Sequence, residues 1–162
     1  QSRGLGRILT KYLDRHPEFV ALVQEGDIKI SGCPNGCGQH HIAAIGFQGS
    51  VRKVGNRALP QYFVSVGGGS TESGAHFGRV VSKIPVRRLT AAIERLLTLY
   101  KEQRDPGESL GAFFRRVPAD SATAALRDLA KMLPDEATEN DFVDLGETHT
   151  FEMLVMEGEC AS

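Results

Sequence analysis

No stretch of this 162-residue sequence approaches the roughly 20 consecutive apolar residues that a membrane-spanning helix needs. Cysteine is also scarce: there are three, an odd number, which does not suggest a disulfide framework. Free thiols fit a reducing compartment, so the expected location is the cytoplasm. The glycines at 67–69 lack the G-x-G-x-x-G pattern that opens a dinucleotide-binding helix. Basic residues are scattered without an RNA-binding aromatic motif, which argues against a nucleic-acid partner.

The net charge of −1 conceals a strong separation of charge along the chain. Residues 1–117 contain 17 basic and 9 acidic residues, a net charge of +8, whereas residues 118–162 contain 2 and 11, a net charge of −9. A basic body favours anionic ligands and partners through its summed field. We therefore expect a body at 1–117 and an acidic C-terminal extension at 118–162, and one hypothesis is that the extension folds back over the body.

Two cysteines, Cys33 and Cys37, lie four positions apart in a short run that is rich in glycine, G-C-P-N-G-C-G at 32–38. Pro34 fixes one φ angle, while the glycines permit conformations that are closed to other residues. Such a loop can aim two sulfurs at one point. Soft thiolate ligands select iron–sulfur clusters, zinc or copper(I), so the loop is interpreted as a metal or cluster site.

Hydrophobic periodicity predicts an alternation of helices and short strands. Helices are expected at 3–15, 18–25, 89–101, 109–115 and 121–133, with a helical turn at 39–43. Strands are expected at 27–31, 44–47, 61–66 and 79–84, and strands or extended arms at 142–145 and 151–156. Turns or loops are expected at 55–60 and 70–74. The pattern indicates an α+β fold in which a mixed or antiparallel sheet packs with helices.

The segment I-S-G-C-P-N-G-C-G-Q at 30–39 resembles the second cluster motif of the sirohaem-dependent sulfite and nitrite reductases. Further similar blocks keep the family's order along the chain. They lie at 45–49, 62–69, 77–79, 83–85 and 110–113, and the end at 158–161 resembles a tail found in some bacterial members. The resemblance implies a nitrite/sulfite reductase haemoprotein-like domain over roughly the first 117 residues.

This resemblance also implies roles for particular residues. Cys33 would be a ligand of a four-iron–four-sulfur cluster, and Cys37 would be a ligand that also bridges to the sirohaem iron. Asn35 and Gly36 would lie beside the sirohaem, and Arg79 would contact its carboxylates. The implied reaction is the six-electron reduction of sulfite to sulfide or of nitrite to ammonia, and the sequence does not distinguish the two anionic substrates.

Family members hold the cluster with four cysteines, a C-x5-C pair followed by a C-x3-C pair. This chain has only Cys33, Cys37 and Cys160, and the first pair would precede Gln1. We therefore expect a C-terminal portion of a longer reductase, inactive when isolated and without an intact cluster or sirohaem of its own. Its implied partners are the upstream part of the same reductase and an electron donor, a ferredoxin or a flavoprotein.

Zinc is the alternative occupant of the loop. Cys33 and Cys37 with His40 or His41 supply three possible ligands for a tetrahedral ion, and Cys160 is a possible fourth. On that hypothesis the chain is a non-catalytic zinc-binding or protein-interaction module.

Overall fold

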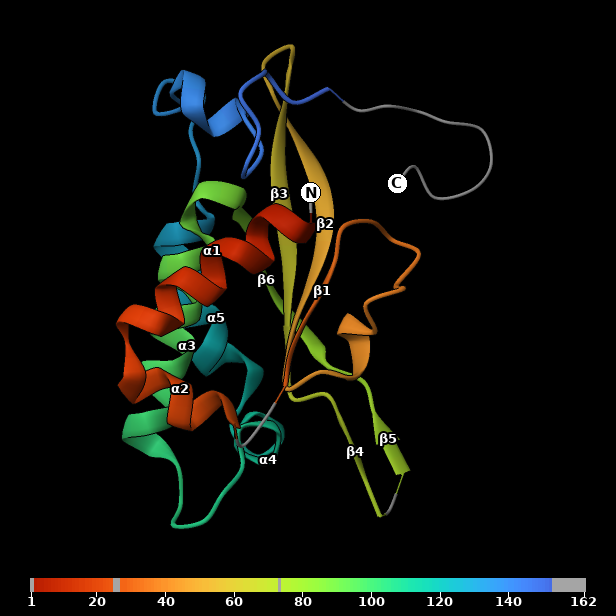
Figure 1. Ribbon diagram of the computed structural model, residues 1–162, viewed down its shortest axis with the longest axis vertical. Coiled ribbons are helices and arrows are strands. Elements are labelled where there is room, and N and C mark those ends of the chain that lie inside the picture. The colour runs from red at the N-terminus through yellow and green to blue at the C-terminus, as the bar shows by residue number, and fades with distance from the viewer. Residues whose placement is uncertain (1, 25–26, 73, 153–162) are drawn as a thin grey trace.

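The computed structural model describes residues 2–24, 27–72 and 74–152, and within them a four-stranded sheet carries helices on one face (Figure 1). The strands are β1 (Ile28–Ser31), β2 (Ile45–Val54), β3 (Arg57–Val66) and β6 (Arg79–Pro85), in the spatial order β1-β2-β3-β6. β1 is parallel to β2, and the other pairs are antiparallel. The predicted α+β class with a mixed sheet is therefore confirmed.

The helices of the described part are α1 (Ser2–Arg15), α2 (Pro17–Gln24), α3 (Leu89–Gln103), α4 (Leu110–Arg116) and α5 (Ala119–Ala130). Short 3-10 turns are η1 (His40–Ile42), η2 (Val86–Arg88) and η3 (Glu139–Phe142), and β4 (Gly69–Thr71) pairs with β5 (Gly74–His76). The helices at 3–15, 18–25, 89–101, 109–115 and 121–133 are confirmed to within a few residues. Within the described ranges, none of the helices is long and apolar enough to cross a bilayer.

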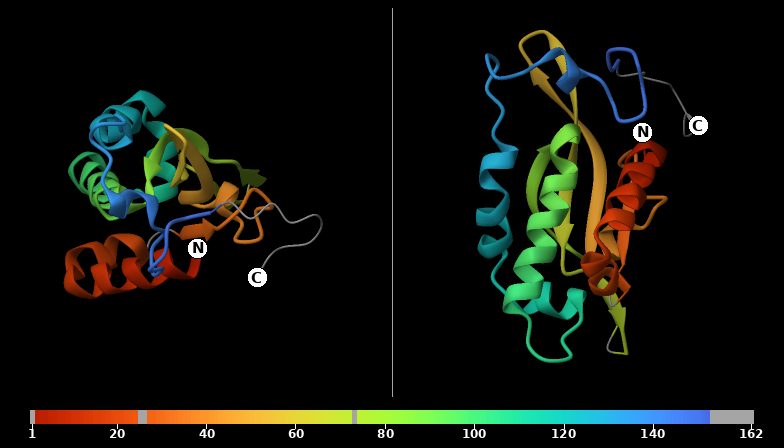
Figure 2. Two further views of the ribbon diagram at one scale, coloured as in Figure 1. Left: turned by 90° about the horizontal axis from the view of Figure 1, so that it is seen from above. Right: turned by 60° about the vertical axis from the view of Figure 1, so that its left-hand side comes forward.

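The main core lies between the sheet and the helices, as the views in Figure 2 show. Alternate residues of β2 and β3 face this core because successive side chains of a strand point to opposite sides. They include Ile45, Phe47, Tyr62, Val64 and Val66. The predicted apolar face of α3 packs against them, with Leu89, Ile93, Leu96, Leu97 and Tyr100 all fully buried. Burying side chains of this size stabilises the fold by about 1.5–3 kcal/mol each before chain entropy is counted.

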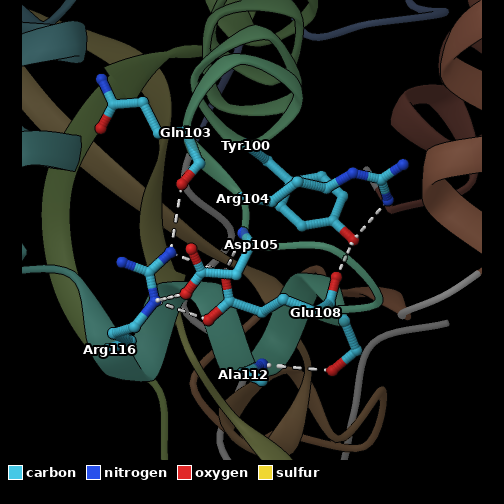
Figure 3. A network of polar contacts seen from close by, with 8 residues as sticks. Tyr100, Gln103, Arg104, Asp105, Glu108, Ala112 and Arg116 are labelled. Atoms are coloured by element: carbon cyan, nitrogen blue, oxygen red, sulfur yellow. Dashed lines mark hydrogen bonds and ion pairs between the residues drawn. The ribbon is translucent and has the colours of Figure 1, made fainter.

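A polar network fixes the loop between α3 and α4 (Figure 3). The hydroxyl of Tyr100, a buried residue near the C-terminal end of α3, donates to the Glu108 backbone carbonyl at 2.5 Å. The Glu108 carboxylate accepts from Nε and Nη2 of Arg116, each at 2.7 Å. Ser109 then caps α4 by accepting from the Ala112 amide at 3.3 Å, as its position before the helix predicts. The network ties α4 to the C-terminal end of α3.

The acidic segment that follows residue 117 folds back on the basic body, which confirms that hypothesis for residues 118–145. Arg57 forms a bidentate pair with Glu139, with distances of 2.6 and 2.8 Å. Arg88 donates to the carbonyls of Leu129 and Lys131, at 3.2 and 2.5 Å. These contacts satisfy carbonyl groups at the end of α5 that have no partner within the helix. The boundary at 117 stays a prediction, and α5 itself packs on β6 and α3.

Several details of the predicted secondary structure differ from the structure. β2 continues to Val54 rather than ending at Phe47, and only Gly55 and Asn56 form the turn that was expected to span 55–60. The loop at 70–74 contributes to the β4–β5 hairpin. Of the two alternatives predicted for 142–145, a strand or an extended arm, the strand is wrong: Phe142 ends η3, and the residues after it are not in a strand. At 151–156 only the first two residues are described, and they are not in a strand; the rest of that prediction lies outside the described residues.

The Arg95–Asp128 pair between α3 and α5 gives a prediction about pH. Hydrogen bonding to Arg95 lowers the pKa of Asp128 from 3.8 to about 2. A carboxyl group with a depressed pKa stabilises the fold above its unfolded pKa and loses that effect as the pH falls. We expect Asp128→Asn to lower the urea midpoint at pH 7, and we expect the difference from wild type to shrink between about pH 4 and pH 2. The assignment of this effect to the Arg95–Asp128 pair would be contradicted by either of two results. One is a difference in urea midpoint between Asp128→Asn and wild type that does not change across this pH range, and the other is an equally large difference for Asp135→Asn.

Candidate metal centre

The cysteine loop joins β1 to η1 on the side of the sheet away from the helices, where Figure 1 shows it in orange. Cys33 is half-buried and Cys37 is exposed, and both are free thiols. Pro34 and Asn35 are exposed at the tip of the loop. Both sulfurs therefore lie on a part of the surface where a bulky group can approach without displacing the core.

Glycine contacts set the position of this loop against the sheet. A Cβ added to Gly38 would lie 2.1 Å from the Ile30 carbonyl oxygen, and one added to Gly49 would lie 2.1 Å from the Gly32 carbonyl oxygen. Real Cβ atoms are not found at such distances, so the loop lies directly on β1 and β2 because these residues lack side chains. Gly36 has a φ of 70°, a conformation that costs other residues energy.

A chain of hydrogen bonds beneath the loop holds its two ends together. The Gly38 amide donates to Ser31 Oγ at 3.1 Å, and Ser31 Oγ lies 2.8 Å from His40 Nδ1. His40 Nε2 lies 3.0 Å from Gln48 Oε1, which can only accept. The consistent assignment has Nε2 donating to Gln48 and Ser31 donating to Nδ1, with a neutral ring. Burial lowers the pKa of His40, and the nearby His41 lowers it further while the Gln48 hydrogen bond opposes the shift.

We expect Ser31→Ala to destabilise the chain by about 1–3 kcal/mol, because it leaves the buried Nδ1 of His40 and the Gly38 amide without their partner. Ser50→Ala is the matched control, since Ser50 Oγ only accepts a long 3.4 Å hydrogen bond from Gln61. Urea unfolding followed by circular dichroism measures both variants. Equal midpoints for the two variants would show that this network does not stabilise the loop.

A cleft of about 440 Å³ begins next to the cysteine loop, at the end of β3 and the start of β6. It is lined by Gly67, Ala75, His76, Phe77, Arg79 and Arg115. His41 connects it to the loop: its ring centroid lies 5.5 Å from that of Phe77, and its carbonyl accepts from the Gly78 amide at 2.7 Å. Phe77 is 71% exposed, an unusual exposure for a phenylalanine. The loop and the cleft thus form one continuous surface with aromatic and cationic groups.

The predicted site residues fall into two places. Cys33, Cys37, Asn35 and Gly36 share the loop, whereas Arg79 lies in the cleft. One Arg79 nitrogen, Nη2, donates to the Phe114 and Val117 carbonyls at the end of α4, so this arginine has a structural role in addition to any cofactor contact. The role of each residue toward a cofactor stays a prediction.

Several arginines have partners that the sequence did not reveal. Arg115 donates to the Gly67 and Gly68 carbonyls, at 3.4 and 3.3 Å. Arg87 and Arg88 donate to backbone carbonyls of the C-terminal segment, those of Asn140 and Leu129. Ser31 and Gln48, the two hydrogen-bond partners of His40 beneath the loop, were also missed. Their only sequence signal is that Ser31 and His40 flank the cysteine run.

The donor set of the loop fits half of an iron–sulfur cluster. Such clusters are held by four cysteine thiolates, and the described residues provide two, both accessible and on one short loop. His40 does not fit as a zinc ligand, because both of its ring nitrogens already have protein partners. Across the described ranges the side chains also form no group of three His, Cys, Asp or Glu that could hold a metal ion. Cys160 lies outside the described residues.

Comparison with known proteins agrees with this chemistry. A family model described as the nitrite and sulphite reductase 4Fe-4S domain matches residues 1–131, and the chain therefore belongs to that family. It is 32% identical over 109 residues to the sulfite reductase [NADPH] hemoprotein beta-component 2 of Pectobacterium carotovorum, covering 60% of this chain and 17% of that protein. It is 29% identical over 116 residues to the corresponding beta-component of Mannheimia succiniciproducens, covering 68% of this chain and 18% of that protein.

Among solved structures, the NirA protein of Mycobacterium tuberculosis has a similar fold, with a TM-score of 0.53 and 25% sequence identity. The match covers 65% of this chain and 21% of NirA. The chain thus spans less than a quarter of the length of each of these relatives. The family and the fold are shared with them.

Proposed function

We propose that this chain is part of a longer sirohaem-dependent reductase and supplies Cys33 and Cys37 as two of the four thiolates of its iron–sulfur cluster. The observation that carries the proposal is the loop itself. Two accessible cysteines lie on a loop that packs closely on the sheet at glycine positions. The chain that contains this loop matches the family model over residues 1–131. The remaining two thiolates come from another part of the same reductase, and the 162-residue chain is inactive by itself.

When bound, the cluster and the sirohaem supply the redox chemistry for a six-electron reduction of sulfite to sulfide or of nitrite to ammonia. The residues of this chain hold and orient these groups. Cys33 and Cys37 would be the thiolates that hold the cluster, Cys37 would be the one beside the sirohaem, and Gly36 would leave room for that group. Asn35 and Arg79 provide polar contacts to the sirohaem. The Ser31–His40–Gln48 trio fixes the loop so that the two sulfurs keep their position through each electron transfer.

Electrons reach this site from a separate donor protein, a ferredoxin or a flavoprotein, in the cytoplasm. The basic character of residues 1–117 supports an acidic donor, since opposite charges steer association. The affinity for such a donor should fall as the salt concentration rises, because screening weakens interactions between exposed charges.

The test is an anaerobic assay of the full-length protein with reduced methyl viologen as a chemical electron donor, so that the natural donor is not needed. We expect sulfide from sulfite or ammonia from nitrite, and the preferred product identifies the substrate. The 162-residue chain, assayed in parallel, should form neither. Full-length protein that contains its cluster and sirohaem and reduces neither anion would refute the proposal.

A further inference from the structure

The exposed side of α1 carries a row of four cations, Arg3, Arg7, Lys11 and Arg15, at intervals of four residues. Residues four apart in a helix lie on nearly the same face, one turn above the other. At 1.5 Å per residue the row is about 18 Å long. α1 lies at the rim of the helical layer in the two views of Figure 2, so the row is on the outside of the described structure.

These four cations differ from most others in the chain by their lack of protein partners. Nearly every arginine outside α1 donates a hydrogen bond to a carbonyl or carboxylate oxygen, and Arg104 donates to a hydroxyl. The arginines with such partners are Arg52, Arg57, Arg79, Arg87, Arg88, Arg95, Arg104, Arg115 and Arg116. Within residues 2–24, 27–72 and 74–152, the four cations of α1 make neither a hydrogen bond nor an ion pair through their side chains, and Arg127 on α5 is similar. Asp14, the acidic residue of α1, is exposed and forms no ion pair with the row in the same ranges.

The arrangement is unfavourable for the helix alone. Like charges at i and i+4 repel, and the row contains three such pairs in succession. Arg3 also lies in the first turn, where the helix dipole favours acidic residues, and that turn contains none; Arg15, in the last turn, is the one member of the row that the dipole favours. Carboxylates on a partner would offset this repulsion. The row is therefore better explained by something that binds to it than by the stability of α1.

We propose that the α1 cation row is a docking surface for a separate acidic protein, one whose contact surface carries several Asp or Glu side chains. Guanidinium groups bind carboxylates through two parallel hydrogen bonds, so the contact depends on the orientation of the groups as well as on their charge. A membrane surface fits less well because the apolar residues of α1 pack on the core and cannot insert: Leu5 and Leu9 are buried in it, and Ile8 and Leu13 are partly buried against it. Single-stranded nucleic acid fits less well because successive bases need a series of exposed rings, whereas α1 has one aromatic residue, Tyr12, which is half-buried and stacked on His16 at 4.3 Å.

The test measures binding of a fluorescent helical peptide that has Glu at every fourth position, with the Gln version of the same peptide as its control. Wild-type chain is compared with Arg7→Ala/Lys11→Ala and with Arg127→Ala/Lys131→Ala, a double variant of equal charge change at the C-terminal end of α5. We expect the Glu peptide to bind in a salt-dependent manner and the α1 variant to weaken it roughly 2- to 30-fold, the value for two exposed ion pairs. The α5 variant should bind like wild type.

Three results would overturn the proposal. Equal weakening by both double variants would mean that summed charge, and not the row, attracts the peptide. Tighter binding of a single-stranded oligonucleotide than of the Glu peptide at the same salt concentration would favour nucleic acid. Binding to the 162-residue chain but not to the full-length protein would mean that another part of the same polypeptide covers the row. Urea midpoints no lower than that of wild type confirm that the variants are folded. The cluster content of the full-length protein tests the proposed function separately, and none of these outcomes bears on it.

Discussion

Cys33→Ser and Cys37→Ser are each expected to remove the iron–sulfur cluster from the full-length protein. Serine oxygen is a harder and far less acidic donor than a thiol, so it does not replace a thiolate on iron. Each variant should lose nearly all of the iron and acid-labile sulfide, together with the visible absorption of the cluster. Product formation should fall to background in the same preparations.

Cys160→Ser is the matched control, since it changes the same side chain elsewhere in the chain. It should retain full iron content and activity. Urea unfolding of the 162-residue chain separates loss of ligands from loss of fold: because Cys37 is exposed, Cys37→Ser should unfold at nearly the wild-type midpoint. Retention of the cluster in both loop variants, or its loss in Cys160→Ser, would show that the ligands have been misassigned.

Gly49→Ala is expected to destabilise the chain by about 1–3 kcal/mol, the usual cost of overpacking. The new Cβ would lie 2.1 Å from the carbonyl oxygen of Gly32 and 2.6 Å from its carbonyl carbon. β2 cannot yield easily because it is hydrogen-bonded on both sides, to β1 and to β3. The cysteine loop must therefore move, and the full-length variant should also assemble less cluster.

Gly6→Ala provides the comparison for Gly49→Ala. Its Cβ would meet nothing within 4 Å, and alanine in a helix is about 0.5–1 kcal/mol more favourable than glycine. This variant should unfold at a slightly higher urea concentration than wild type. If Gly49→Ala matched wild type in urea midpoint and in cluster content, the close contact between β2 and the loop would not be needed to place the cysteines.

The elements with a strong local signal were predictable from the sequence. The helix at 89–101 has an unbroken apolar face, and the structure places it at Leu89–Gln103. Ser109 was expected to cap the next helix, and it does. In both cases the residues that decide the structure lie within one or two helical turns of each other, so a local pattern contains the information.

The errors arise where distant residues decide the structure. The second half of β2 is polar, since Arg52 reaches across the sheet to Gln61 and to the Ala130 carbonyl, and a polar run resembles a loop. Pro60 suggested a turn, yet it lies within β3 opposite Val51. Phe142 belongs to an alternating pattern typical of a strand, but it packs with Val54 at the end of the β2–β3 hairpin after a capping box has started η3.

The candidate site shows the same division between local and distant information. The two cysteines and their glycines form a contiguous motif that the sequence displays directly. What keeps the motif in place is not contiguous: Gln48 and Gly49 lie on β2, more than ten residues after Cys37. Their role depends on the parallel pairing of β1 and β2, which brings Ser31 opposite Gln48. A sequence pattern with a period of two residues does not reveal that register.

Metal analysis of the full-length protein, purified without air and without added metal, tests the central claim most directly. If Cys33 and Cys37 complete a four-thiolate site, the protein will contain iron and acid-labile sulfide, with the absorption bands of an iron–sulfur cluster and of sirohaem. Zinc in a one-to-one ratio to protein, with neither iron nor sulfide present, would contradict the account and assign the loop to a zinc module.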